Sequence, residues 1–119
     1  MTFPWLRTLT ALVALAAPVS AEAHAILIQS DPAIGATVKA GQIEIRLRYN
    51  SRIDRTRSRL TLNRPDKTQS VLPIGRDGLD DTLTTTAELP SGNYVLRWQV
   101  LAVDGHITRG DVPFTVTGR

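Results

Sequence analysis

The sequence predicts an all-β domain: a small Greek-key β-sandwich or barrel of the immunoglobulin-like kind, with about seven strands. Three observations lead to this prediction. Residues 42–50 and 93–102 alternate apolar and polar side chains with a period of two, as half-buried strands do. Clusters of Pro, Gly, Asp and Ser recur between the apolar segments, which is typical of turns. After residue 23, no segment keeps a helical period over about three turns.

Each strand has its own justification in the pattern. In 42–50 the apolar residues occupy every second position and charged residues lie between them. Pro73 predicts that its strand lies at a sheet edge, because proline cannot donate a hydrogen bond to a neighbour. The segment 83–89 is rich in threonine, a β-favouring residue. In order, the expected strands are 25–29, 42–50, a short one containing Leu60 and Leu62, 71–74, 83–89, 93–102 and 110–117.

Length and composition limit the classes of function. The chain has 119 residues, enough for one ordinary core. It contains no cysteine, which excludes disulfides, thiol nucleophiles and Cys-ligated zinc or Fe–S sites. The net charge is +3, and arginines are concentrated between Arg46 and Arg64. This stretch could be either a solvated basic face or an electrostatic docking surface. Only Tyr49 is aromatic in that stretch, so a nucleic-acid partner is not expected.

The first 23 residues have the features of a secretory signal peptide. A basic residue, Arg7, precedes an apolar run over 9–17, and Ala21-Glu22-Ala23 provides an A-x-A cleavage site. The run is too short to cross a bilayer, and without cysteine the chain cannot be a lipoprotein. We therefore expect cleavage after Ala23, an exported domain over 24–119, no membrane insertion after cleavage, and a monomer.

The candidate chemistry lies at the two histidines. Cleavage would make His24 the first residue, so that its α-amine and imidazole could chelate one metal ion. Nitrogen ligands of this kind suit Cu(II). The second histidine occurs in Asp104-Gly105-His106, where a carboxylate and an imidazole follow the strongest predicted strand. Each feature alone also fits a simple interpretation, an incidental histidine or an ordinary Asp-Gly turn. Their conjunction favours one metal site formed by His24, Asp104 and His106.

The chain resembles the CopC-type periplasmic copper-binding proteins over essentially all of 24–119. The resemblance rests on His24-Ala25, then Ser30-x-Pro32-x-x-Gly35 and Gly92-x-Tyr94-x-Leu96-x-Trp98, followed by Asp104-Gly105-His106 and Gly110-x-x-x-Phe114-x-Val116. It implies a Greek-key sandwich or barrel in the periplasm. It also implies one Cu(II) per mature chain, bound by the amine and side chain of His24, by Asp104 and by His106. A CopD-type inner-membrane protein is the implied partner.

Three departures from the family pattern stand out. The only methionine is Met1, so the Cu(I) site that some members build from methionines should be absent. The segment Tyr49-Asn50-Ser51 lacks the acidic residue often found there, which leaves the supporting role of that residue open. Ala102 replaces a frequent serine. None of these changes removes an implied copper ligand.

Two other functions remain compatible with the sequence. A metal-free immunoglobulin-like interaction module would have the same strand pattern. A copper monooxygenase would also use an N-terminal histidine, but it needs an exposed platform for its substrate. Trp98, the single tryptophan after residue 23, lies on the apolar face of its strand instead. We therefore expect a non-enzymatic carrier or buffer of copper, in resistance or homeostasis, with the direction of copper transfer open.

Overall fold

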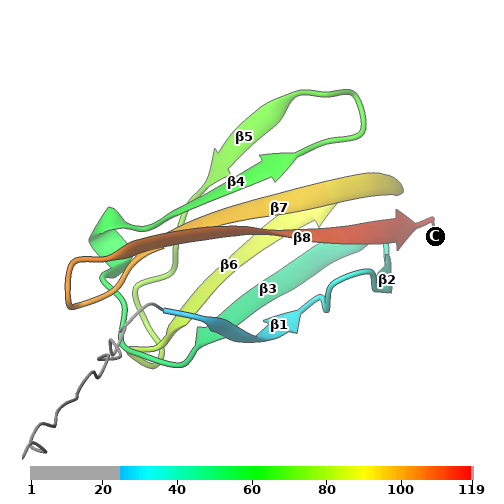
Figure 1. The fold of residues 1–119 in the computed structure, drawn as a ribbon. Helices are drawn as coiled ribbons and strands as arrows, with labels where there is room; N and C mark the ends of the chain where they lie inside the picture. The colour runs from blue at the N-terminus through cyan, green and yellow to red at the C-terminus, as the bar shows by residue number, and fades with distance from the viewer. Residues whose placement is uncertain (1–24, 119) are drawn as a thin grey trace, which may run out of the picture.

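The computed structural model describes residues 25–118, which form a sandwich of two β-sheets (Figure 1). A three-stranded sheet has the order β1-β3-β6, and a five-stranded sheet has the order β2-β8-β7-β4-β5. The predicted all-β sandwich is confirmed, and the described strands form no closed barrel. The strands are β1 (Leu27–Asp31), β2 (Thr37–Lys39), β3 (Gly41–Tyr49), β4 (Arg59–Asn63), β5 (Gln69–Leu72), β6 (Thr82–Leu89), β7 (Gly92–Leu101) and β8 (Ile107–Thr117), with a short 3-10 helix, η1 (Arg55–Arg57).

The chain crosses between the two sheets after β1, β2, β3, β5 and β6. Strand β2 was not among the expected strands, which is why the described chain has one strand more than the seven expected. It has only three residues, too few for an alternating pattern, and it pairs in parallel with the end of β8. Backbone pairing with a distant strand, which no local pattern reveals, is therefore what makes this segment a strand.

The core lies between the sheets and follows the predicted alternation. On β3, every second residue from Ile43 to Tyr49 is buried, while the intervening charged residues are exposed. The same alternation buries Tyr94, Leu96, Trp98 and Val100 on β7. The rings of Tyr49 and Trp98 meet edge to face across the sandwich, with centroids 5.2 Å apart and an interplanar angle of 70°. The apolar positions recognised in the sequence are thus the ones that join the two sheets.

Two aromatic side chains of β7, Tyr94 and Trp98, make specific contacts with neighbouring segments. The hydroxyl of Tyr94 donates a 2.7 Å hydrogen bond to the carbonyl of Pro90, four residues earlier, as in the tyrosine corner of immunoglobulin-like sandwiches. Trp98 lies opposite Gly110 of β8, and its indole covers that glycine. A Cβ atom at position 110 would come within 2.7 Å of Cε2 of Trp98. Glycine is therefore required there for the tryptophan to reach the core.

The strand ends differ slightly from the predicted ones. β1 starts and ends two residues later than expected, and β5 stops at Leu72, directly before Pro73. β5 lies at the edge of its sheet, as the proline predicted. Within residues 25–118 no helix is long and apolar enough to cross a membrane. The predicted signal segment and His24 lie outside the described residues.

Candidate metal centre

The connection between β7 and β8 holds the two candidate ligands in a short turn. The N–H of Ala102 donates to the carbonyl of His106 at 2.8 Å, and the N–H of Gly105 donates to the carbonyl of Ala102 at 2.9 Å. Gly105 has a φ of 96°, a left-handed conformation that disfavours residues with a side chain. The turn therefore needs Gly105, and it places Asp104 and His106 on either side of it, both at the surface.

Asp104 contacts His106 through both oxygens of its carboxylate. Oδ2 lies 2.8 Å from Nδ1 of the imidazole, and Oδ1 accepts a 3.1 Å hydrogen bond from the N–H of His106. About a third of the Asp104 side chain is exposed, against more than half of the His106 side chain. The two predicted ligands are thus brought together, and the carboxylate also orients the imidazole.

This contact bears on the ionisation of Asp104 and on the tautomer of His106. The hydrogen bonds from the side chain and the backbone of His106 lower the pKa of Asp104, so its carboxylate is ionised at neutral pH. An ionised carboxylate only accepts hydrogen bonds, so Nδ1 must carry the proton that it shares with Oδ2. The lone pair of the imidazole then lies on Nε2, the ring nitrogen away from Asp104, so the carboxylate would have to release Nδ1 before both residues could bind the same metal ion. Pairing of this kind between a carboxylate and an imidazole is common beside metal ligands.

The start of the described chain is anchored next to this turn (Figure 1). The hydroxyl of Thr108, two residues after His106, donates a 2.8 Å hydrogen bond to the carbonyl of Ala25. Ala25 is buried, and Ile26 exchanges two hydrogen bonds with Asn50: its N–H donates to Oδ1 at 2.8 Å, and its carbonyl accepts from the N–H at 3.0 Å. The residue directly after His24 is therefore held between β8 and the chain that follows β3.

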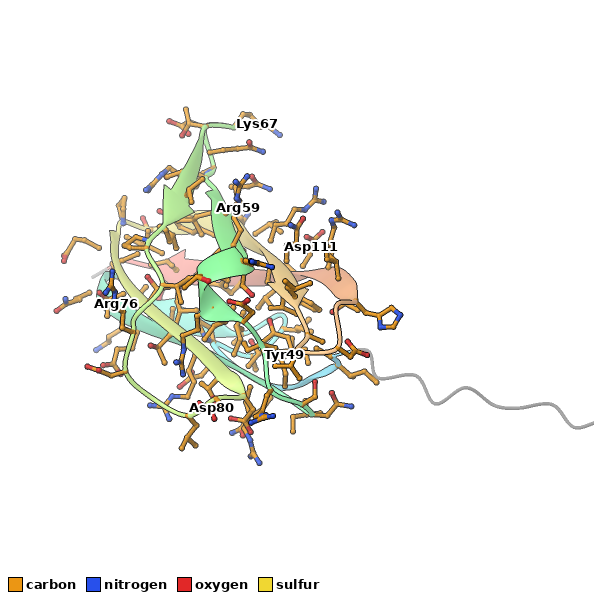
Figure 2. All side chains as sticks on the ribbon, turned by 90° about the vertical axis from the view of Figure 1, so that its left-hand side faces the viewer. Tyr49, Arg59, Lys67, Arg76, Asp80 and Asp111 are labelled. Atoms are coloured by element: carbon orange, nitrogen blue, oxygen red, sulfur yellow. The ribbon has the colours of Figure 1, made fainter. Side chains whose placement is uncertain are left out.

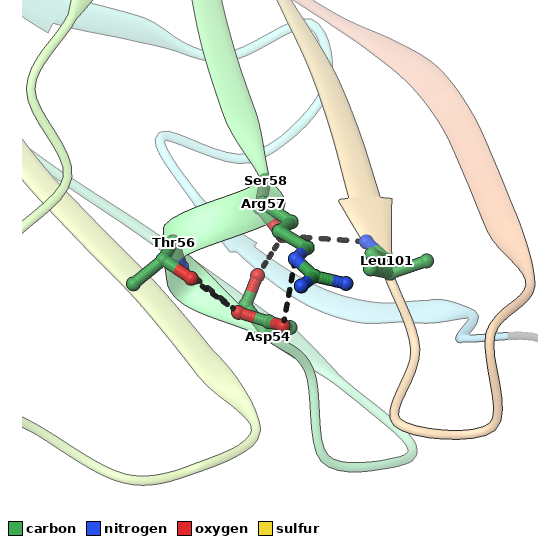
Figure 3. A network of polar contacts seen from close by, with 5 residues as sticks. All are labelled: Asp54, Thr56, Arg57, Ser58 and Leu101. Atoms are coloured by element: carbon green, nitrogen blue, oxygen red, sulfur yellow. Dashed lines mark hydrogen bonds and ion pairs between the residues drawn. The ribbon is translucent and has the colours of Figure 1, made fainter.

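A polar network around η1 holds the last residues of β7 (Figure 3). Asp54 donates its N–H to the carbonyl of Leu101 at 2.8 Å, and its own carbonyl accepts a 2.7 Å hydrogen bond from the hydroxyl of Ser58. That hydroxyl also accepts a 3.3 Å hydrogen bond from the N–H of Leu101. Next to it, the N–H of Val103 donates to the carbonyl of Arg52. The strand that leads into the Asp104–His106 turn is thus fixed from the side.

Two of the three predicted ligand residues can be placed. Asp104 and His106 lie together, and His24 falls just before the described residues. Within 25–118, no group of three His, Cys, Asp or Glu side chains converges. A three-residue site at this position would therefore need a ligand from outside that range. Ala25, which is anchored beside the turn, is the described residue that follows His24.

The residues that support the site could not be recognised in the sequence. By residue type Thr108 is one more β-favouring residue, and its contact with Ala25 spans 83 positions along the chain. Asn50 lies in the segment where the family pattern often has an acidic residue, yet its side chain binds the N–H of Ile26. No local signal could have identified either role, because both depend on which strands become neighbours.

Comparison with known proteins assigns the fold to a known class of domain. The model of the CopC domain matches residues 27–117, so the chain belongs to the CopC family. The protein YobA of Escherichia coli strain K12 is 31% identical over 98 residues, which cover 79% of each chain. The crystal structure of CopC from Methylosinus trichosporium OB3b is similar, with a TM-score of 0.74 and 25% identity over 81% of this chain and 96% of the other.

A further similar structure shows the same fold with a different composition. It is that of PcoC from Escherichia coli, a methionine-rich copper resistance protein. It has a TM-score of 0.66 and 22% identity, covering 80% of this chain and all of the other. The present chain has one methionine, Met1. The shared fold therefore does not depend on a methionine-rich segment.

Proposed function

We propose that this protein is a non-enzymatic periplasmic carrier or buffer of Cu(II) that serves copper resistance or homeostasis. It is exported by residues 1–23, is cleaved after Ala23, and binds one Cu(II) ion per mature chain. The ligands are the α-amine and imidazole of His24, the imidazole of His106 and the carboxylate of Asp104. The copper is cargo, which a CopD-type protein of the inner membrane receives or delivers.

One observation carries this proposal: the imidazole–carboxylate pair of His106 and Asp104 lies beside the point where the N-terminal end of the domain is anchored. The hydrogen bond from Thr108 to Ala25 holds the residue that follows His24 next to the strand that follows His106. Membership of the CopC family supports the choice of copper. The similarity in fold to PcoC, a copper resistance protein, is compatible with the physiological role.

The donor set favours Cu(II) over Cu(I). All proposed ligand atoms are nitrogen or oxygen, which Cu(II) prefers, whereas Cu(I) prefers thiolates and thioethers. The chain has no cysteine, and its single methionine lies in the predicted signal segment. We therefore expect a paramagnetic spectrum with nitrogen and oxygen ligands, and no separate Cu(I) site.

The decisive experiment compares the protein that begins at His24 with a variant that retains Ala23. The extra residue converts the α-amine into an amide, which is a poor ligand unless it loses its proton. Competitive Cu(II) titration should show a large loss of affinity in the extended protein, on the order of a hundredfold or more. Circular dichroism should show the same fold in both.

The variant His106→Ala should lose a comparable part of the affinity, because no third histidine can replace the imidazole. Asp104→Ala should lose less, since Cu(II) gains more from an imidazole nitrogen than from a carboxylate oxygen. Lys39→Ala, an exposed residue on β2, is the matched control and should bind copper like the unmodified protein. Unchanged affinity in both His106→Ala and the extended protein would refute the proposed site.

A further inference from the structure

A groove of about 550 Å³ lies where β4 begins and β5, the edge strand of the five-stranded sheet, ends. Its walls come from three parts of the chain: η1 with the start of β4, the end of β5, and the loop that follows β5. Its apolar wall is formed by Val71, Leu72 and Ile74, and Val71 is 64% exposed. Its polar wall includes three arginines, Arg55, Arg59 and Arg76.

Some arginines on the surface have acidic partners, whereas others, among them these three and Arg46, Arg52, Arg64 and Arg109, have none within the described residues. Arg48, Arg57 and Arg97 each form an ion pair with an aspartate. In the part of the chain that the structure describes, no carboxylate forms such a pair with Arg55, Arg59 or Arg76.

The guanidinium of Arg55 donates hydrogen bonds to the backbone carbonyls of Leu79, Thr82 and Arg76. The side chains of Arg59 and Arg76 are exposed on the side of the molecule shown in Figure 2. The groove therefore presents three guanidinium groups that form no ion pair with a carboxylate of the described residues.

The strand beside the groove has one unpaired edge. β5 pairs with β4 over Leu60–Asn63 on one side and ends the five-stranded sheet on the other. Its outward backbone groups can therefore accept another extended chain, as sheet edges do in peptide recognition. In such a chain alternate side chains point to the same face, so one set would enter the groove.

We propose that this groove, together with the free edge of β5, binds an extended acidic segment of a partner protein, with carboxylates alternating with apolar side chains. The carboxylates share the face that enters the groove, where they would bind Arg59 and Arg76 while their methylene groups pack on Val71 and Ile74. Charge complementarity favours this occupant, because guanidinium groups bind carboxylates through paired, charge-assisted hydrogen bonds. The inference goes beyond copper binding and does not depend on it.

Two other occupants fit the observations less well. A second copy of this chain, paired through β5, would bring two sets of arginines together, and like charges across strands repel. An anionic lipid surface would be attracted by the same charges, but it could use neither the concave shape of the groove nor the hydrogen bonds of the strand edge. Both serve as alternative outcomes of the test.

The test uses a fluorescein-labelled peptide amide, Glu-Val-Glu-Val-Glu-Val-Glu, and the metal-free exported protein. Fluorescence anisotropy at low ionic strength should show saturable binding, and the peptide with lysine in place of glutamate should not bind. The double variant Arg59→Gln/Arg76→Gln should weaken binding at least about tenfold. Val71→Glu, which puts a negative charge in the groove, should weaken it similarly. Hydrogen exchange should show protection of Gln69–Leu72 in the complex.

The matched control is Lys39→Gln/Arg46→Gln, which removes the same charge from exposed positions outside the groove. It should bind the peptide like the unmodified protein. Equal weakening in both double variants would overturn the proposal, because net charge alone would then explain binding. It would also fail if the peptide did not bind, if phosphatidylglycerol vesicles bound through Arg59 and Arg76 while the peptide did not, or if sedimentation showed dimers that the Arg59→Gln/Arg76→Gln variant lost.

Discussion

At the scale of single residues, the hydroxyl of Thr108 holds the segment that leads into β1. Its hydrogen bond to the carbonyl of the buried residue Ala25 ties the domain start to β8. In Thr108→Val that carbonyl loses its partner, which should destabilise the apo protein by about 1–3 kcal/mol. If His24 binds copper as proposed, the Cu(II) affinity should fall as well, because the amine is no longer held near His106. Urea unfolding and competitive Cu(II) titration measure the two effects.

Thr115→Val is the control for this prediction. Thr115 lies on the same strand, and its hydroxyl bonds to the side chain of Asn93, far along β8 from Ala25. This variant should keep the Cu(II) affinity. If Thr108→Val also kept it while losing stability, the hydroxyl would support the fold without positioning the metal site.

At position 110 only glycine fits, because any side chain would meet the ring of Trp98. The indole of Trp98 covers this glycine, and a Cβ atom there would overlap the ring. Because Trp98 is buried and joins the two sheets through Tyr49, it has little room to move. Gly110→Ala should therefore destabilise the protein by about 1–3 kcal/mol. Gly118→Ala, where no heavy atom comes closer than 3.9 Å, should have almost no effect in the same urea titration.

At the scale of elements, the stability of η1 depends on one carboxylate. Asp54 caps this helix. Its Oδ1 accepts two hydrogen bonds from Thr56, one from the hydroxyl at 2.8 Å and one from the backbone N–H at 3.1 Å. These hydrogen bonds lower the pKa of Asp54, and Arg57 adds to the effect. A lowered pKa in the folded state means that the ionised form stabilises the fold. This stabilisation is present above the unfolded value of about 3.9 and is lost as the pH falls through the folded pKa.

We therefore predict that Asp54→Ala lowers the Tm at pH 7, and that the difference from the unmodified protein shrinks below about pH 4. Thermal denaturation followed by circular dichroism across this range measures it. A difference for Asp54→Ala that stayed constant down to about pH 2 would show that its charge is not the cause.

At the scale of the whole molecule, the proposed metal site would connect the two sheets. The chain after His24 continues into β1 of the three-stranded sheet, while Asp104 and His106 belong to the turn between two strands of the five-stranded sheet. A bound ion would therefore link the sheets at one end of the sandwich. Because an ion that binds only the folded state stabilises it, Cu(II) at a hundred times its Kd should add about 2.7 kcal/mol.

Differential scanning calorimetry with increasing Cu(II) tests this prediction. The Tm should rise with the concentration of Cu(II) for the protein that begins at His24. It should stay nearly constant for His106→Ala, whose apo form should unfold like the unmodified protein because the imidazole is exposed. An equal rise in both proteins would point to copper binding elsewhere.

The fold could be predicted because two of its strands, β3 and β7, are long and half-buried. The alternation on β3 and β7 reports the core directly, since one face of each strand meets the other sheet. Pro73 likewise marked the edge strand. The pattern failed at β2, where three residues become a strand only by pairing with β8. The choice between sandwich and barrel also stayed open, because closure depends on how edges meet and leaves no trace in alternation.

By itself, the sequence determined the strand faces and the absence of sulfur side chains after Met1, and it predicted the two histidines proposed to bind copper. These are local properties, set by side-chain chemistry and by spacing along the chain. Only the tertiary structure decided that Asp104 orients His106, that Thr108 and Asn50 anchor the domain start, and that Arg55, Arg59 and Arg76 line one groove. The contact between Asp104 and His106 depends on the conformation of the turn that contains them. The anchor at Ala25 and the groove exist only when segments far apart in the sequence pack together.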